Sequence, residues 1–407
     1  MSQLYPKSQG SLQQIYSNCV LENNNRHIHY RPEITLFKAV YKRHTLFTIE
    51  SIDHELSSNV SFDSCQRFVI KRHGDLINKI YLQVTLPHID YPIDTTDEEK
   101  SYWTNRVGFN LINNVELTVG GQLIDKLYGL YMHIWSELTH SKDKKLLLDK
   151  MVGSKGDDGI SKGLCCDRPH TLTIPIFLPC HEYIQNSIPL IALQYHDVSI
   201  NFTFNSLENC IQKGLLPPNR LSNVKLWIDY IFLDTEERRL FAQSGHEYLN
   251  NYTGNMMEQF ILNKSLFNLN FYHCVKELFW VVRNKNPLGD KFTDFTIDNK
   301  KSNIKEIQMY KNGKEIFSSG AKKNKYFNYY LPYRRHTGKP DLGINCYPFA
   351  IFPEKFEPFG HLNFAEIDNF KLEVTKETED NCEIFIYARF IDHLRVMSGM
   401  GGRRFVN

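Results

Sequence analysis

A ten-residue stretch with regular alternation, from Tyr195 to Phe204, constrains the fold of this chain more than any other segment. Alternate positions form two sets, Tyr195, Asp197, Ser199, Asn201 and Thr203 on one side and His196, Val198, Ile200, Phe202 and Phe204 on the other. Because successive side chains of a strand point to opposite faces, this period of two predicts a β-strand with one buried face. Upstream, Pro189 breaks any helix and lets Leu190, Ile191 and Leu193 pack as apolar contacts.

Two hairpin signals support a chain built of antiparallel strands. Asn114–Val119 alternates, and Gly120 and Gly121 then supply two positive-φ positions for a tight turn before Gln122–Leu127 returns. Ile307–Phe317 contains Asn-Gly, which favours a type I′ turn. Further strands are expected at Phe68–Ile70, Ile80–Leu86, Leu172–Pro179, Leu226–Leu233, Phe260–Leu269, Lys276–Val282, Pro348–Phe356, Ile367–Val374 and Cys382–Phe390. An aromatic content of 13% also favours sheet, since flat side chains pack well on a pleated surface.

Helices are expected only as short insertions between strands. Apolar residues recur at near-helical spacing over Leu130–Leu138, and Lys142–Lys150 continues with one or two more turns. Residues 1–30 are polar and lack a pattern, which is typical of an arm without a core of its own. The chain is therefore expected to be all-β with few helices.

The second half of the chain repeats the plan of the first. In each half a Gly-containing hairpin precedes a Pro-bearing apolar segment, which precedes a long alternating strand. This shared order supports two copies of one fold. Each copy needs two facing sheets to bury its apolar faces, but the pattern alone leaves sandwich and barrel undecided.

Four segments resemble the major capsid proteins of nucleocytoplasmic large DNA viruses, in order along nearly the whole chain. In chain order they are Gly120–Asp125, Pro189–His196, Leu226–Arg239 and Arg395–Gly402. Ile34–Ile52 resembles the segment that opens the first jelly roll of that family. Pro358–Asp368 resembles a further family motif, but Phe359, His361 and Ala365 stand where the family has small hydroxyl residues. The turn hydrogen bonds that those hydroxyls would make are therefore not expected here.

The resemblance implies a double jelly roll, that is, two tandem eight-stranded antiparallel jelly rolls with short inserted helices. The expected parts are an N-terminal arm at 1–30, a first jelly roll at 31–233, a linker at 234–250, a second jelly roll at 251–395 and a C-terminal tail at 396–407. The arm and the flexible tail are expected to make contacts between subunits, because neither has a core of its own.

The resemblance also implies a structural protein of the virion, expressed late. It predicts a homotrimer that forms pseudo-hexagonal capsomers of an icosahedral shell assembled in the host cytoplasm. The implied partners are neighbouring capsomers, minor capsid proteins and the inner membrane face. The second jelly roll has short loops, so a minor or penton-proximal capsid paralogue stays as an alternative. A jelly-roll metal enzyme or glycan-binding module is the alternative from another class.

The enzyme alternative rests on a single metal-like spacing. His27, His29 and Glu33 match the spacing by which cupins bind a metal, and alternate strand positions would point the two imidazoles the same way. However, Pro32 intervenes, and the glycines that flank the cupin motif are missing. We therefore predict no metal site, no cofactor and no catalytic residue.

Other candidates for chemistry have simpler interpretations. Lys42–His44 could contact phosphate, but a solvated or interface turn is favoured. Tyr326–Tyr330 could stack bases, but with only Lys323 and Lys325 nearby, an aromatic strand or interface patch is favoured. A net charge of +2 supplies no field that recruits nucleic acid, so no specific nucleic-acid binding is expected.

The cysteines and the apolar runs constrain the cellular compartment in which the chain is expected to work. The nine cysteines are odd in number and contain no C-x-x-C, so reduced thiols are expected, and the adjacent pair Cys165 and Cys166 is expected to be an ordinary loop pair. We find no signal-peptide pattern at the start and no apolar run near the roughly 20 residues that span a bilayer. The chain is expected to be soluble or held to other proteins.

Overall fold

The computed structural model describes residues 31–56, 60–92, 95–96, 99–154, 163–285, 290–297, 301–317, 323–378 and 380–404. The chain divides into two compact units, residues 1–45 and 46–407. The described part of the first unit, 31–45, contains neither helix nor strand, and the predicted arm at 1–30 lies outside the described residues. Among the described helices, none has the length and apolarity to cross a membrane.

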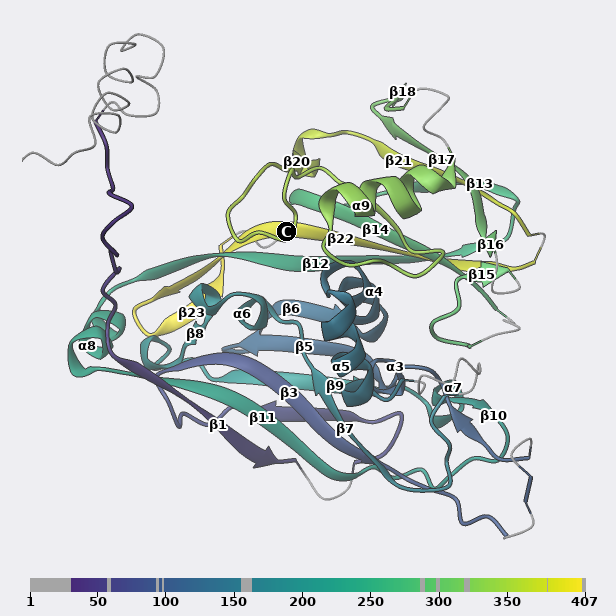
Figure 1. Ribbon diagram of the computed structural model, residues 1–407, viewed down its shortest axis with the longest axis horizontal. Helices are drawn as coiled ribbons and strands as arrows, with labels where there is room; N and C mark the ends of the chain where they lie inside the picture. The colour runs from purple at the N-terminus through teal and green to yellow at the C-terminus, as the bar shows by residue number, and fades with distance from the viewer. Residues whose placement is uncertain are drawn as a thin grey trace, which may run out of the picture. The chain divides into compact units, whose positions relative to one another are not determined.

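The first half of the second unit contains two facing four-stranded antiparallel sheets (Figure 1). One sheet has the order β1-β11-β3-β7, with the short β8 (Ile188–Pro189) also paired to β3, and the other has the order β2-β9-β5-β6. The strands are β1 (Phe47–Glu55), β2 (Cys65–Val69), β3 (Leu76–Leu86), β5 (Ile112–Val119), β6 (Gln122–Tyr128), β7 (His170–Pro175), β9 (Val198–Phe204) and β11 (Ser222–Leu233).

The second half is built in the same way. Its sheets have the orders β12-β22-β14-β19 and β13-β21-β17-β18. The strands are β12 (His246–Phe260), β13 (Lys264–Asn268), β14 (Cys274–Asn284), β17 (Ile304–Lys311), β18 (Lys314–Glu315), β19 (Asn345–Pro348), β21 (Phe370–Lys376) and β22 (Cys382–Met397). Short additions are the pairs β4 (Tyr102–Trp103) with β10 (Ile211–Lys213) and β15 (Thr296–Ile297) with β16 (Lys301–Ser302), together with β20 (Leu362–Asn363) and β23 (Met400–Arg403).

The strand order identifies both halves as jelly rolls. If the eight main strands of each half are counted along the chain, one sheet reads first, eighth, third and sixth, and the other reads second, seventh, fourth and fifth. Both halves give this order, with every pairing antiparallel. The predicted all-β double jelly roll is therefore confirmed.

The alternating stretch forms β9, with the predicted face inward. Val198, Ile200, Phe202 and Phe204 are at most 1% exposed. The strand begins at Val198 rather than Tyr195, because the backbone N–H of Tyr195 donates to the carbonyl of Gly399, at 2.9 Å, instead of to a sheet neighbour.

Both predicted hairpins form. Gly120 and Gly121 have φ of 57° and 83°, and Asn312 and Gly313 have φ of 49° and 78°. Positive φ at both central residues is the requirement of a type I′ turn, whose twist matches that of the flanking strands.

Helical segments lie between the same two strands in each barrel. The predicted helices are confirmed as α4 (Gly129–Thr139) and α5 (Lys142–Val152), between β6 and β7. Between β18 and β19 lie the π-helical turn η4 (Tyr326–Tyr330) and α9 (Leu331–Arg335). Of the two predicted alternatives for Tyr326–Tyr330, the aromatic strand is therefore wrong, and the interface patch stays a prediction. The other helices are α3 (Val107–Leu111), α6 (Pro179–Glu182), η1 (Ile184–Asn186), η2 (Leu190–Ala192), α7 (Leu207–Cys210), α8 (Thr235–Gln243) and η5 (Phe364–Glu366).

The predicted strand at Pro348–Phe356 is also wrong, since β19 ends at Pro348. The backbone N–H groups of Phe349 and Ala350 both donate to the carbonyl of Lys276, at 2.8 and 3.0 Å. Two consecutive N–H groups that point the same way break the alternation of a ladder, so the strand stops there.

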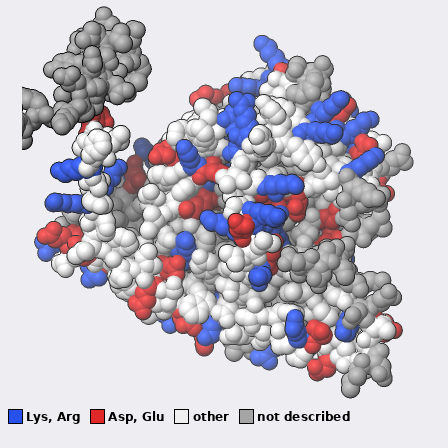
Figure 2. Space-filling view, viewed as in Figure 1, with Lys and Arg blue, Asp and Glu red and all other residues white. Residues whose placement is uncertain are grey.

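The connection between the barrels is short and helical. The side chain of Asp234 accepts a hydrogen bond from the N–H of Glu237 at 2.8 Å, which caps α8 at its first turn. The predicted linker at 234–250 thus holds α8 and the first residues of β12. Acidic and basic side chains alternate over much of the face shown in Figure 2, in keeping with a net charge of only +2.

Candidate functional site

The two barrels meet at α4, which lies between them (Figure 1). Residues 129–138 of this helix are all buried. Tyr131 and Trp135, one turn apart, face the outer side of the β12-β22-β14-β19 sheet. The Tyr131 ring lies 5.6 Å from that of Tyr387, and the Trp135 ring lies 5.8 Å from that of Phe279. Both second-barrel residues are at most 1% exposed, so the helix covers an aromatic sheet face.

A buried ion pair crosses the same junction. Arg389 of β22 is 1% exposed, and it forms an ion pair and hydrogen bond with the carboxylate of Glu182 in α6. Its guanidinium also lies 3.9 Å from the centre of the Trp135 ring. Burial raises the pKa of Glu182, although Arg389 lowers it. The pair thus carries a desolvation penalty that only its intact geometry offsets.

A second charged cluster fixes α4 and α5 to the first barrel. Arg106 forms ion pairs with Glu137 and Asp149, each at 2.7 Å, and is almost fully buried. Burial, and next the charge of Arg106, hold the pKa of His133 well below its usual range, so the neutral ring accepts from Arg106 at 3.1 Å. Burial raises the pKa of Glu137 to about 7, against the lowering effect of Arg106. Lys145 extends the cluster to Asp341 of the second barrel, at 3.3 Å.

The predicted flexible tail is wrong for residues 396–404. Residues 400–403 form β23, which pairs with β22. The N–H of Gly401 donates to Nδ1 of His196 at 3.1 Å, beside the first-barrel hairpin. A Cβ on Gly401 would lie 2.6 Å from Leu193, so the glycine permits this close approach. The Gly-Met-Gly-Gly run is therefore a packed contact of the chain with itself, while residues 405–407 lie outside the described part.

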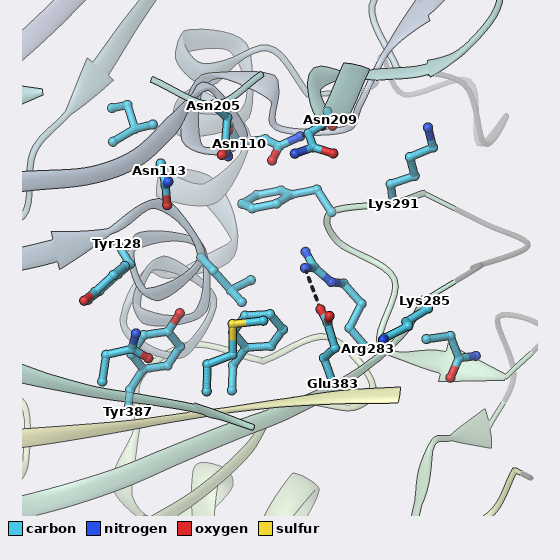
Figure 3. A pocket seen from close by; sticks show the side chains of 17 residues that line it. Asn110, Asn113, Tyr128, Asn205, Asn209, Arg283, Lys285, Lys291, Glu383 and Tyr387 are labelled. Atoms are coloured by element: carbon cyan, nitrogen blue, oxygen red, sulfur yellow. Dashed lines mark hydrogen bonds and ion pairs between the residues drawn. The ribbon is translucent and has the colours of Figure 1, made fainter. Parts of the chain in front are cut away.

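A polar groove of about 680 Å³ opens beside the junction (Figure 3). Asparagines from both barrels line it, with basic residues at the second-barrel side. The labelled lining residues are Asn110, Asn113, Asn205, Asn209, Arg283, Lys285, Lys291, Glu383, Tyr128 and Tyr387. Arg283 is paired with Glu383 at 3.5 Å and also lies over the Phe385 ring. The described lining residues of the groove supply mainly amide and cationic groups, together with the carboxylate of Glu383.

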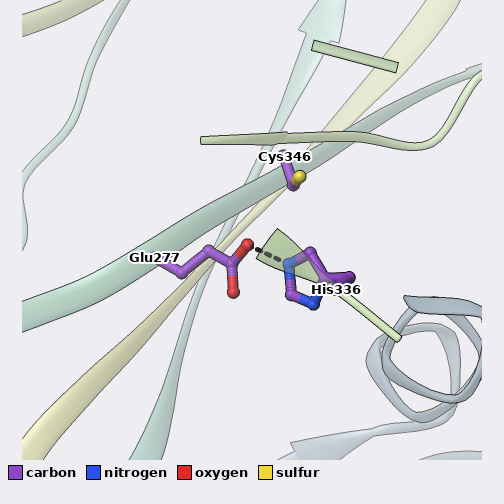
Figure 4. A group of neighbouring side chains, drawn as sticks. All are labelled: Glu277, His336 and Cys346. Atoms are coloured by element: carbon purple, nitrogen blue, oxygen red, sulfur yellow. Dashed lines mark hydrogen bonds and ion pairs between the residues drawn. The ribbon is translucent and has the colours of Figure 1, made fainter. Parts of the chain in front are cut away.

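Glu277, His336 and Cys346 bring three possible metal-ligand atoms within 4.8 Å of one another (Figure 4). His336 places Nε2 at 2.5 Å from Glu277 and Nδ1 at 3.0 Å from Glu354. Burial lowers the pKa of His336, but Glu277 and the hydrogen bonds of the ring raise it well above its usual range overall. Burial raises the pKa of Cys346 to about 12, so its sulfur is a thiol. With an imidazolium and a thiol, the group is an ion-paired cluster in which one cation, His336, lies between the carboxylates of Glu277 and Glu354.

This cluster predicts a stability that falls as pH rises. A histidine whose folded pKa is raised stabilises the protein fully below its unfolded pKa, about 6.5, and this contribution is lost as pH rises through the folded pKa. We expect Glu277→Gln to be less stable than the parent chain at pH 6 and the difference to narrow steadily toward pH 9 in urea unfolding. Glu366→Gln, at an exposed position, is the control and should run parallel to the parent. A constant difference for Glu277→Gln would contradict the charged state assigned to His336.

The structure does not bring the other candidate residues from the sequence together into one site. His27 and His29 lie outside the described residues, while Glu33 and Lys42–His44 lie in the separate unit 31–45. Burial raises the pKa of Cys165 and that of Cys166, the latter to about 12, which disfavours reactive thiolates. The eight described cysteines are free, and Cys19 lies outside the described part.

Two family models together match nearly the whole chain. The model described as the major capsid protein N-terminus matches residues 35–234, and that of the large eukaryotic DNA virus major capsid protein matches residues 237–402. The first match thus covers the β1–β11 barrel and the second covers the β12–β22 barrel.

Individual relatives agree over full length. The major capsid protein of Pyramimonas orientalis virus is 34% identical over 92% of this chain and 95% of its own length. That of Paramecium bursaria Chlorella virus 1 is 29% identical with the same coverage. The capsid structure of PBCV-1 superimposes with a TM-score of 0.78 at 27% identity, over 92% of this chain and 100% of that one. The Faustovirus major capsid protein, at 13% identity and a TM-score of 0.72 over 90% of this chain and 93% of that one, shares the fold. The chain belongs to the major capsid protein family of large eukaryotic DNA viruses.

Proposed function

We propose that this chain forms a homotrimeric capsomer that tiles the icosahedral shell of a large DNA virus. The observation that carries the proposal is the repeat of one jelly-roll strand order in both halves, joined by a buried junction. Three such chains supply six similar barrels, which suits a pseudo-hexagonal tile made from a single gene product. A closed ring of this kind needs the same pair of patches to recur from one chain to the next.

The proposal extends to the partners and the division of the chain. We infer contacts with neighbouring capsomers, minor capsid proteins and the inner membrane face, in a shell assembled in the host cytoplasm. We propose the predicted division of the chain, with the arm at 1–30, the barrels at 31–233 and 251–395 and the linker at 234–250, and we treat 396–407 as a C-terminal segment whose residues 400–403 pack as β23. The work is attachment rather than turnover, so no catalytic residue, cofactor or metal is assigned.

Solution mass tests the trimer. Sedimentation or light scattering of the full chain is expected to give three times the mass of one chain, stable on dilution into the micromolar range. Imaging of concentrated samples is expected to show hexagonal arrays of these particles. A chain that stays monomeric at high concentration would rule the proposal out.

A minor capsid role is the second candidate. Two relatives, "Capsid protein 1" and "Probable capsid protein 4", come from one virus, Acanthamoeba polyphaga mimivirus, so a single virus can encode more than one protein of this kind. Copy number in purified virions separates the two roles. A major subunit is expected to be the most abundant shell protein by quantitative mass spectrometry, whereas a minor one is present at a small fraction of that level.

A further inference from the structure

The junction inside the chain gives a template for a contact between chains. In the first barrel the helical segment between β6 and β7 covers the outer face of the second barrel's β12-β22-β14-β19 sheet. The covered residues Phe279 and Tyr387 are 0% and 1% exposed. Because the second barrel repeats the first, it has its own helical segment, and the first barrel has its own outer sheet face. Within the described residues of one chain, these two surfaces do not meet.

The helical segment of the second barrel has one packed side and one open side. Phe327 and Leu331 are buried, and the Phe327 ring lies 5.5 Å from that of Trp280 in the barrel. On the open side are three tyrosines, here named the tyrosine face: Tyr329, Tyr330 and Tyr333, exposed by 52%, 49% and 89%. A groove of about 500 Å³ runs along them, between Pro332 and Pro340. In the first barrel, Tyr131 and Trp135 hold the corresponding place on α4 and are at most 5% exposed.

The outer face of the β1-β11-β3 sheet is the matching open surface. Residues that lie opposite each other in antiparallel strands share a face of the sheet. Asp53 of β1, Trp227 of β11 and Tyr81 of β3 therefore form one row, and Ser51 of β1 and Asp229 of β11 form the next. Trp227 and Tyr81 are half-buried, and Ile49, on the same face, is 45% exposed. We name Ile49, Asp53, Tyr81, Trp227 and Asp229 the sheet face.

The charges of the two surfaces are opposite. Residues 323–340 contain no Asp or Glu but include Lys323, Lys325, Arg334, Arg335 and Lys339. Figure 2 shows Lys and Arg side chains gathered over the region where Figure 1 draws α9. The sheet face carries Asp53 and Asp229, with Glu55 beside them on β1 and Lys225 paired to Asp53. The contact inside the chain also combines aromatic rings with a charge pair, but there the arginine, Arg389, lies on the sheet and the acid, Glu182, lies on the helical side.

We propose that the tyrosine face of one chain docks on the sheet face of a second copy of this chain. The proposal rests on the proposed trimer and names the surfaces that join it. The contact is heterologous: each copy gives its tyrosine face to one neighbour and its sheet face to the other, and the series closes when the last copy meets the first. Every barrel-to-barrel contact of the ring then has the same design, a helical aromatic side against an outer sheet face.

Single substitutions at exposed positions test the two surfaces. Tyr333→Glu and Ile49→Glu are each expected to weaken self-association by about 30-fold or more, as for a central aromatic or apolar anchor of an interface. Tyr272→Glu, at a tyrosine that is 59% exposed and lies on neither face, is the matched control and should assemble as the parent does. Melting followed by circular dichroism checks that each variant is folded. If either glutamate variant melts early, Arg334→Glu or Asp229→Arg is used in its place.

Mixing the two variants gives the sharper result. Each variant keeps the surface that the other has lost, so an equal mixture is expected to form dimers with one chain of each kind, and to stop there. Native mass spectrometry of one isotope-labelled variant with the other identifies such dimers. A Tyr333→Glu chain that trimerises as tightly as the parent overturns the inferred contact but leaves the proposed trimer intact. A mixture of the two variants that stays monomeric also overturns the inferred contact. A parent chain that never trimerises overturns the proposed function itself.

Discussion

Arg389→Met is expected to lower the free energy of unfolding by about 3–5 kcal/mol, the cost of leaving one partner of a buried ion pair alone. Arg389 is the cation that neutralises Glu182 at the junction, and Glu182 is itself only 13% exposed at its side chain. Methionine keeps much of the packing volume but removes the charge, so the carboxylate must stay buried without a cation or take up a proton. The Trp135 ring also loses the guanidinium 3.9 Å above it.

Urea unfolding of the full chain measures this loss of stability, and two further variants identify its cause. Arg395→Met lies on the same strand, but its ion pair with Glu247 is 47% and 43% exposed, so a change within about 1 kcal/mol is expected. Adding Glu182→Gln to Arg389→Met removes the stranded charge and is expected to restore part of the stability. If the double variant is as unstable as the single one, lost packing rather than charge explains the effect.

Gly129→Ala is expected to destabilise the chain by about 3 kcal/mol or more, at the upper end of what overpacking costs. Gly129 is the first residue of α4, directly after β6. A Cβ at this position would lie 2.0 Å from the carbonyl oxygen of Phe109 and 2.2 Å from that of Ile112. Both obstacles are backbone atoms, so no side-chain rotation relieves the clash, and the start of α4 must move away from α3 and β5.

Gly121→Ala separates this steric cost from a conformational one. Gly121 has a φ of 83°, and a Cβ there would meet nothing within 4 Å. Only the left-handed backbone opposes alanine, which costs about 1–2 kcal/mol. Thermal or urea unfolding of both variants should therefore show a much lower stability for Gly129→Ala than for Gly121→Ala. Equal losses would mean that the start of α4 adjusts more easily than its contacts indicate.

The sequence predicted best where a local pattern decides the structure. Alternation over 198–204 and the Asn312-Gly313 pair depend on neighbours along the chain, and both formed as expected. The prediction failed at Pro348–Phe356 and at Tyr326–Tyr330, since apolar and aromatic runs suit a buried strand and a packed loop or helix equally well. Only the carbonyl of Lys276, a distant residue, shows why β19 ends where it does.

The buried charges were missed although they leave a trace in the sequence. Arg389 interrupts the otherwise apolar run from Ile384 to Ile391, at a position that alternation places on the outer face of its sheet. A charged residue at that position either faces solvent or pairs with a buried residue of opposite charge. The partner, Glu182, is 207 positions away, and no local pattern links the two. Likewise Glu137 looks like an exposed helical residue until Arg106 is placed beside it.

The helix α8 has a consequence for the speed and order of assembly. Because this short tether joins the two barrels, the second barrel meets the first at a high effective concentration, and that encounter does not depend on how much protein is present. In the proposed trimer, every alternate contact of the six-barrel ring is then made during folding of single chains, and only the remaining three need collisions between molecules. Dilution can therefore undo a misassembled ring without unfolding its parts, so errors in a growing shell stay reversible.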